Sequence, residues 1–403
     1  MREVVIADYV RTPRGKATAR GGLAHLTATD LVVHLMAALP GRTGLDPTSV
    51  EDVVLGCADQ VGEQGSNTAR TAALLAGWGP DVSGMMVNRF CASGIDAVTG
   101  AAARIRGGDV DLAVAGGVES VSRVPIFSDG GPLFADRETI RRVGSVHMGI
   151  AADLCATLAG HTREQLDCYG LETQAKAAAA WARGAFDRCL VPLPGPDGGP
   201  GLATDEHVRP HTSRESLAAL PPAFADLGAN GQDAIALAAN PVVDRIEHLH
   251  TVGTSPAMAD AAALLVLTTA DGAAQRGLRP RARLLTAATA AVDPVIMLTA
   301  GQLAVERVLV RAGLRPDDID VFEFAEAFAS LCLTFREELG AGPDRMNPNG
   351  GTMAMGHAFG ATGAILIGQC LEELEASGGR YGIAAVSGAA GVGSAVLVER
   401  LPA

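Results

Sequence analysis

Two stretches of this sequence, GLDPTSVEDVVLG at 44–56 and GLRPDDIDVFEFA at 313–325, follow one pattern at an offset of 269 positions (313 − 44). Each begins with a glycine that ends a helix, continues through a proline-containing turn and an acidic helical start, and finishes in an apolar strand. A pattern of this length repeated within one chain predicts two halves of similar topology.

The repeat continues downstream at the same offset, where CASGIDAV at 91–98 aligns with GATGAILI at 360–367. An alanine-rich helix, a glycine turn and an apolar strand are expected after each. These two strands, within 111–120 and 382–394, are apolar without alternation, which is typical of a sheet covered on both faces. We therefore expect an α/β fold made of two duplicated β/α halves.

The segment between the repeats differs in character from both of them. It contains the proline-rich run VPLPGPDGGPG and the helical pattern ETQAKAAAAWARGAF. Because it is long and has helical patterns of its own, we expect a loop domain over one face, where a substrate lid would lie, rather than a linker. The predicted divisions are an N-terminal half at 1–122, completed by about 245–272, a loop domain at 123–244 and a C-terminal half at 273–403.

Composition narrows the function classes. Of 403 residues, 48% are hydrophobic and 19% charged, which indicates a globular enzyme. A net charge of −13 and 4% aromatic residues argue against a nucleic-acid partner. The N-terminus lacks a signal-peptide pattern, and no run of about 18 apolar residues predicts a membrane span. The seven cysteines are scattered without a CxxC pair, which favours a reduced, cytoplasmic protein without disulfides or a metal site.

Cys91 lies in NRFCASGI at 88–95. Most cysteines are buried and inert, so a packing role is the default interpretation. The small residues that follow predict a buried helix, whose first N–H groups and dipole would lower the pKa of the thiol and favour a nucleophile.

His357 lies in NPNGGTMAMGHAFGATGA at 347–364, just before the helix equivalent to the one after Cys91. A two-fold relation between the halves would bring imidazole and thiol to one cavity, where the histidine could take the thiol proton. A third stretch, VSGAAGVGSA at 386–395, ends a strand in a glycine turn whose N–H groups could line an anion pocket.

These stretches, with VRTPRGK, GVESVSRVP and HMGIAADLCA, resemble the thiolase family over nearly the whole chain. The resemblance implies a layered αβαβα thiolase fold with an inserted loop domain. It implies ping-pong acyl transfer in which Cys91 carries the acyl group and His357 activates it. It also places His147 and Met148 near the substrate and Ser255 beside the pantetheine.

The sequence departs from the family pattern at four positions. Ser387 stands where the family has a second cysteine that acts as acid and base. A hydroxyl is a poor base at neutral pH, but Ser387 stays a catalytic candidate that could pass a proton as part of a relay. Ala325 replaces an asparagine that orders an oxyanion-binding water, a loss worth about 10²–10³ in rate. Ala358 replaces a proline. Ala389 replaces a glycine, and its N–H with that of Cys91 would still form the other oxyanion hole.

We therefore expect an acyl-CoA acyltransferase for lipid metabolism that performs thiolysis or Claisen condensation with acyl-CoA and CoA. The alternatives are a divergent acyltransferase, hydrolase or retro-Claisen lyase with another acceptor, and a non-catalytic acyl-CoA-binding subunit. The resemblance also implies a homodimer or homotetramer with no cofactor beyond the CoA thioester substrate. Pro221 stands where family members often carry a basic residue, which leaves the contacts to the CoA nucleotide open.

Overall fold

The computed structural model describes residues 2–402. Its first half contains, in chain order, β1 (Val4–Arg11), β2 (Gly15–Lys16), α1 (Ala28–Thr43), β3 (Asp52–Gly56), α2 (Thr68–Leu75), β4 (Ser83–Val87), α3 (Ser93–Gly107) and β5 (Leu112–Glu119). The middle of the chain contains α4 (Pro132–Ala135), α5 (Arg137–Val143), α6 (Met148–Ala159), α7 (Arg163–Ala182), α8 (Arg214–Ala218), α9 (Ala225–Leu227) and α10 (Asp233–Ala239).

The remaining elements are β6 (Ala259–Thr269), α11 (Ala270–Gln275), β7 (Ala282–Ala291), α12 (Ala300–Ala312), β8 (Val321–Phe324), α13 (Ala329–Leu339), α14 (Thr352–Met355), α15 (Phe359–Ser377), β9 (Tyr381–Ser387) and β10 (Val392–Arg400). The strands follow the order β4-β3-β5-β6-β1-β7-β10-β9-β8, with β2 paired to β6. The two halves of this sheet join where β1 meets β7 through only two residue pairs.

The repeat predicted from sequence is present in the strand register. Asp52 of β3 pairs in parallel with Ala113 of β5, and Val321 of β8 pairs in parallel with Gly382 of β9. Both members of the second pair lie 269 positions after their counterparts (321 − 52 and 382 − 113). The helices α1 and α12 end at glycines in the left-handed conformation, Gly44 and Gly313, again 269 positions apart. The α/β fold with two duplicated halves is thereby confirmed.

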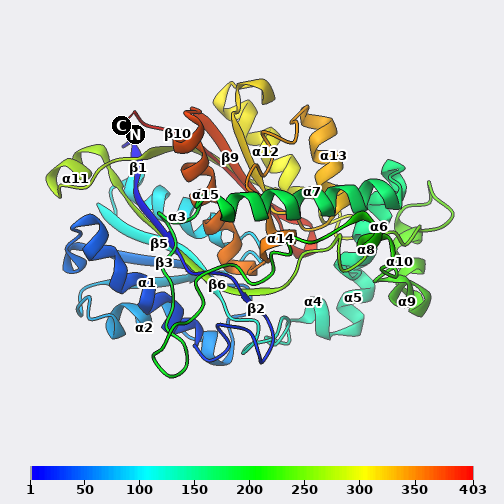
Figure 1. Ribbon diagram of the computed structural model, residues 1–403, viewed down its shortest axis with the longest axis horizontal. Helices are drawn as coiled ribbons and strands as arrows, with labels where there is room; N and C mark the ends of the chain where they lie inside the picture. Colours follow the sequence, from blue (N-terminus) through cyan, green and yellow to red (C-terminus); the bar gives the residue numbers. More distant parts are fainter. Residues whose placement is uncertain (1, 403) are drawn as a thin grey trace.

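The helices α3 and α15 form the central layer of the molecule (Figure 1). They approach so closely that a Cβ on Gly94 would lie 2.7 Å from the backbone nitrogen of Ala364, and one on Gly363 would lie 2.4 Å from that of Ile95. Gly94 and Gly363 are themselves repeat equivalents, so the pseudo-two-fold axis passes between them. Only glycine allows this approach, which brings the starts of the two helices together.

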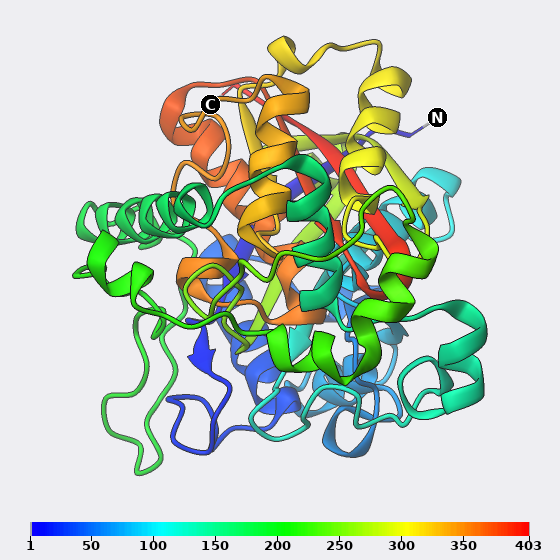
Figure 2. The ribbon, with the colours of Figure 1, turned by 90° about the vertical axis from the view of Figure 1, so that its right-hand side faces the viewer.

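The outer layers complete the expected αβαβα arrangement. α1 and α2 cover the outer face of the first half of the sheet, and α12 and α13 cover that of the second. The helices α4 to α10 gather on one side of the molecule, and Figure 2 views them from that side. They lie within the predicted loop domain, whose boundaries at 123 and 244 stay a prediction.

Within residues 2–402, no single helix is long and apolar enough to cross a membrane. One bent pair, Arg137–Ala159 with Arg163–Ala182, meets that test jointly by length and composition.

Candidate active site

Cys91 lies in the loop between β4 and α3, and polar side chains of the same loop fix its conformation. Asn88 Oδ1 accepts a hydrogen bond from the Phe90 N–H at 2.8 Å, and Ser93 Oγ accepts one from the Arg89 N–H at 2.8 Å. Phe90 has a φ of 50°, a strained value for a bulky residue that is typical of functional sites. The helix begins at Ser93, two residues after the thiol.

The electrostatic environment of Cys91 differs from the sequence-based expectation. Burial, with a smaller contribution from the buried carboxylate of Glu119, raises the pKa of its thiol to about 12. The prediction of a thiol pKa lowered by the helix dipole is therefore wrong, because the residue is only 5% exposed and faces negative charge. The backbone N–H groups of Cys91 and Ala389 oppose this shift, since both face the sulfur.

His357 precedes α15 and is held from both sides. Its backbone N–H donates to the Ala257 carbonyl at 2.6 Å, and its ring Nδ1 forms a hydrogen bond with Thr362 Oγ1 at 2.9 Å. Thr362 is the repeat equivalent of Ser93 (362 − 93 = 269), so equivalent hydroxyls order the histidine and the cysteine loop. Burial, with a smaller contribution from Arg14, lowers the pKa of His357 to about 4. The imidazole is therefore neutral and can accept a proton.

The thiol and the imidazole meet at Phe359. Its ring lines the same small chamber as Cys91 and packs against the His357 ring, with 4.7 Å between ring centroids. No hydrogen bond joins the Cys91 sulfur to the His357 ring in this structure. Phe359 has a φ of 32°, again strained for an aromatic residue. Phe359 therefore connects the two predicted catalytic groups, since it lines the chamber of Cys91 and packs against the ring of His357.

The chamber beside Cys91 is small, about 30 Å³, and is lined by Ala58, Asp59, Phe90, Cys91, Ile126, Phe127, Asp129, Phe134, Met148, Phe359 and Ala389. Phe127, Phe134 and Met148 also line a second cavity of about 250 Å³, mostly apolar, which His147 borders. His147 caps α6, its Nδ1 accepting the Gly149 N–H at 3.0 Å. Of the predicted substrate-binding residues, His147 and Met148 therefore border this second cavity, and Met148 also borders the chamber of Cys91.

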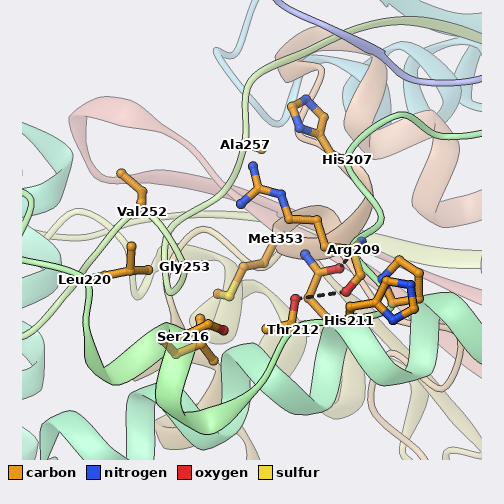
Figure 3. Close-up of a pocket in the computed structure, with 13 residues that line it drawn as sticks. His207, Arg209, His211, Thr212, Ser216, Leu220, Val252, Gly253, Ala257 and Met353 are labelled. Carbon is orange, nitrogen blue, oxygen red and sulfur yellow. Dashed lines mark hydrogen bonds between the residues drawn. The ribbon is translucent and has the colours of Figure 1, made fainter.

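A larger cleft of about 500 Å³ is bordered by Ala257, whose carbonyl accepts the His357 backbone N–H. Figure 3 shows its lining, with the Arg209 guanidinium pointing toward Ala257 and the Met353 thioether toward Ser216. The cleft is lined by Gln174, His207, Arg209, Pro210, His211, Thr212, Ser216, Leu217, Leu220, Val252, Gly253, Ala257 and Met353. Ser255 lies on the loop that borders this cleft, and its hydroxyl donates to the Thr251 carbonyl at 2.7 Å.

Two of the four positions that depart from the family pattern, Ser387 and Ala325, are not among the residues that line the thiol chamber. The Ser387 hydroxyl donates to the Leu298 carbonyl at 2.6 Å and accepts the Gly301 N–H at 2.9 Å. Ser387 is not among the residues that line the chamber, whereas Ala389 is. Ala325 is buried at the end of β8, and its side chain offers no hydrogen-bond donor.

Two carboxylates near Cys91 were missed by the sequence interpretation. Glu119 ends β5 and accepts hydrogen bonds from the N–H groups of Ala58 at 2.8 Å and Gly360 at 2.9 Å, which links the two halves beside the thiol. Asp59 lines the chamber itself. The sequence did carry a signal for both carboxylates. Glu119 ends one buried strand of a parallel pair and Asp59 comes soon after the other, and the ends of such strands meet at one edge of the sheet.

The site thus lies in an α/β fold of two repeated halves, with a buried thiol just before one central helix and a neutral imidazole just before its repeat equivalent, and the fold and site together match one class of enzymes. The family model described as "Thiolase, N-terminal domain" matches residues 4–232, and "Thiolase, C-terminal domain" matches residues 278–400. The chain belongs to the thiolase family.

Full-length relatives agree with this assignment. The chain is 38% identical to the beta-ketoadipyl-CoA thiolase of Pseudomonas aeruginosa, covering 99% of this chain and 100% of the relative. It is 35% identical to the 3-ketoacyl-CoA thiolase of Aliivibrio fischeri, covering 99% and 100% respectively. The crystal structure of the Bacillus anthracis acetyl-CoA acetyltransferase matches with a TM-score of 0.86 and 31% identity, over 100% of this chain and 99% of that one. The predicted thiolase resemblance and acyl-CoA acyltransferase activity are confirmed.

Proposed function

We propose that this acyltransferase works through a thioester on Cys91, with His357 taking the thiol proton. The observation that carries the proposal is the position of the sulfur, which borders a chamber and faces the N–H groups of Cys91 and Ala389. Two backbone donors aimed at one point can hold the oxyanion that forms when the sulfur attacks a carbonyl carbon. A cysteine that served packing alone would need neither the chamber nor the donors.

The pKa values of Cys91 and His357 indicate at which point of the reaction the thiol proton is transferred. A thiol with a pKa near 12 and an imidazole with a pKa near 4 are both neutral in the resting enzyme. The thiolate therefore forms only as the sulfur attacks, with the proton passing to His357 in the transition state.

CoA is proposed to occupy the large cleft. Arg209 gives this cleft a positive charge in a chain of net charge −13, and His207 and His211 add ring nitrogens that can form hydrogen bonds, which supports binding of a polyanion. The acyl chain would then extend into the apolar cavity bordered by Phe127 and Met148. His357 contacts one residue of each, since its backbone N–H donates to Ala257 of the cleft and its ring packs against Phe359 of the chamber.

A second candidate activity is hydrolysis of the acyl enzyme. The chamber volume of about 30 Å³ equals the share of about one water molecule. A water held there would lie beside the acyl-Cys91 carbonyl. Thiolysis remains the leading proposal, because the cleft of about 500 Å³ offers space for a CoA molecule.

We also propose a homodimer that lies in a reducing compartment such as the cytoplasm. β4 is the edge strand of the first half, and Met85 on it is 38% exposed, next to the exposed apolar residues Leu74 and Leu75 of α2. An unpaired edge with apolar neighbours favours pairing with a second copy. The seven free cysteines support the compartment.

The test of the leading proposal is steady-state thiolysis of acetoacetyl-CoA by CoA, with acetyl-CoA formation as the readout. The wild-type enzyme should produce acetyl-CoA, and Cys91→Ala should abolish production while the protein stays folded. Production of acetate from acetyl-CoA without CoA consumption would favour the hydrolase. Undiminished thiolysis by Cys91→Ala would overturn the proposal.

A further inference from the structure

The second half of the reaction lacks an obvious proton-transfer group. CoA must lose its thiol proton to attack the acyl enzyme, and Ser387 is placed poorly for this role. Its hydroxyl hydrogen is directed to the Leu298 carbonyl and its oxygen to the Gly301 N–H, both at the start of α12. The hydroxyl proton and one of the two oxygen lone pairs of Ser387 are therefore engaged by backbone groups rather than by a substrate in the Cys91 chamber.

We propose that Asp59 is the catalytic residue that transfers protons in this half of the reaction. The proposal rests on the proposed function, because it requires the acyl group on Cys91. Asp59 and Cys91 line the same chamber, and the Asp59 side chain is buried. The remaining carboxylate of the chamber, Asp129, belongs to an exposed turn.

The segment of Asp59 is fixed to the cysteine loop. Asn88, which orders that loop, donates from Nδ2 to the Ala58 carbonyl at 2.8 Å. The Asp59 N–H donates to Glu119 Oε1 at 3.3 Å, and the other oxygen of Glu119 binds the N–H of Gly360 at the start of α15. Carboxyl, thiol and histidine helix therefore form one rigid unit, as a reaction with defined geometry requires.

The charge environment of Asp59 suits proton exchange. Burial raises the pKa of its carboxyl, and the charge of Asp129 raises it further, while the N–H groups of Phe127, Ser128 and Asp129 act in the opposite direction. The titratable groups near it are Asp129, Cys91, Cys57 and Glu119, and the described lining of the chamber contains no cation. A carboxyl shifted toward neutral pH can both give and take a proton.

Every proton can be accounted for in the thiolysis of a 3-ketoacyl-CoA. First, Cys91 gives its proton to His357 and its sulfur bonds to C3. The C2–C3 bond breaks, its electron pair goes to C2, and protonated Asp59 gives its proton to C2, which releases acetyl-CoA.

Then CoA gives its thiol proton to the Asp59 carboxylate, and its sulfur bonds to the acyl carbon. The bond to the Cys91 sulfur breaks, and Cys91 recovers its proton from His357. The enzyme returns to its starting state.

The experiment separates loading of Cys91 from unloading. p-Nitrophenyl acetate acetylates the thiol without needing an acid, because its phenolate leaves unprotonated at neutral pH. CoA is then added, and the loss of the acetyl group from Cys91 is followed by intact mass. Asp59→Asn should load within about threefold of wild type and unload more slowly by about 10²–10⁴-fold. Asp197→Asn, an exposed loop carboxylate, is the matched control and should unload as wild type does.

The pH profile distinguishes catalysis from a structural role. Wild-type unloading should rise with pH through the ionisation of Asp59 and then level off. Asp59→Asn should instead keep rising toward the ionisation of the CoA thiol. Unloading by Asp59→Asn at the wild-type rate with an unchanged profile would overturn the role of Asp59. Failure of the wild-type protein to load Cys91 would instead overturn the proposed function.

Discussion

Cys91 is an uncharged thiol in the resting enzyme, because burial and the Glu119 carboxylate raise its pKa to about 12. Alkylation by iodoacetamide requires the thiolate. We therefore expect the alkylation rate of Cys91 to keep rising with pH up to pH ~10, without a plateau near the ordinary thiol pKa of about 8.5. The measurement is the mass of the Cys91 peptide after timed alkylation. A plateau below pH ~8 would show a thiolate stabilised by the site.

The sequence predicted Cys91 and His357 as site residues but did not point to the two carboxylates near the thiol, Glu119 and Asp59. Cys91 and His357 were predicted from their place before equivalent helices, which the two-fold repeat brings together. The lowered thiol pKa was expected from the helix dipole alone, since the sequence does not show that Glu119 faces the sulfur. Asp59 was missed because GCADQVG matches no catalytic motif, although its place after a buried strand was a signal that it lies where strand ends meet.

At the scale of elements, the close approach of α3 and α15 is the feature on which the site depends. Gly94→Ala would place a Cβ 2.7 Å from the Gly360 carbonyl oxygen, so one helix must shift. We expect a loss of stability of about 1–3 kcal/mol, as for overpacking of a core, measured by urea unfolding. Gly100→Ala in the same helix is the control, because nothing lies within 4 Å of its added Cβ. It should instead stabilise by up to about 1 kcal/mol. Equal effects of both changes would contradict the packing described here.

Glu119 connects β5 to both catalytic loops, and every neighbour within hydrogen-bond distance of its carboxylate is a donor. These neighbours include the N–H groups of Ala58 and Gly360 and the Gln64 amide at 2.8 Å. In Glu119→Gln the new NH₂ group would face donors, so we expect a loss of about 2 kcal/mol in unfolding free energy. Thermal and urea unfolding measure this loss. An unchanged midpoint would show that Glu119 does not join the loops.

The sequence predicted these elements well where the repeat could be compared with itself. β3 and β8 were both predicted from the aligned stretches, and their register obeys the predicted offset. The loop domain has no internal counterpart, so its short helices and the apolar cavity beside Met148 could not be placed before the chain was folded.

At the scale of the whole molecule, the exposed edge strand β4 should pair with a second copy. Met85→Lys would place a charge on this edge, and charged residues on edge strands oppose pairing. We expect analytical ultracentrifugation to show a dimer for the wild-type enzyme and a monomer for the variant. Val310→Lys, on the outer surface of α12, is the control and should remain dimeric. A wild-type monomer would contradict the proposed dimer, and a variant that stays dimeric would show that β4 is not the interface.

The central claim is that two repeated halves of this thiolase meet to place an acyl group on Cys91. Its most direct test is to mix the enzyme with acetoacetyl-CoA in the absence of CoA, quench with acid and digest with trypsin. The peptide from Phe90 to Arg104, which contains Cys91 as its only cysteine, should gain the mass of one acetyl group. An acyl group found on another residue, or thiolysis that proceeds with this peptide never modified, would contradict the account.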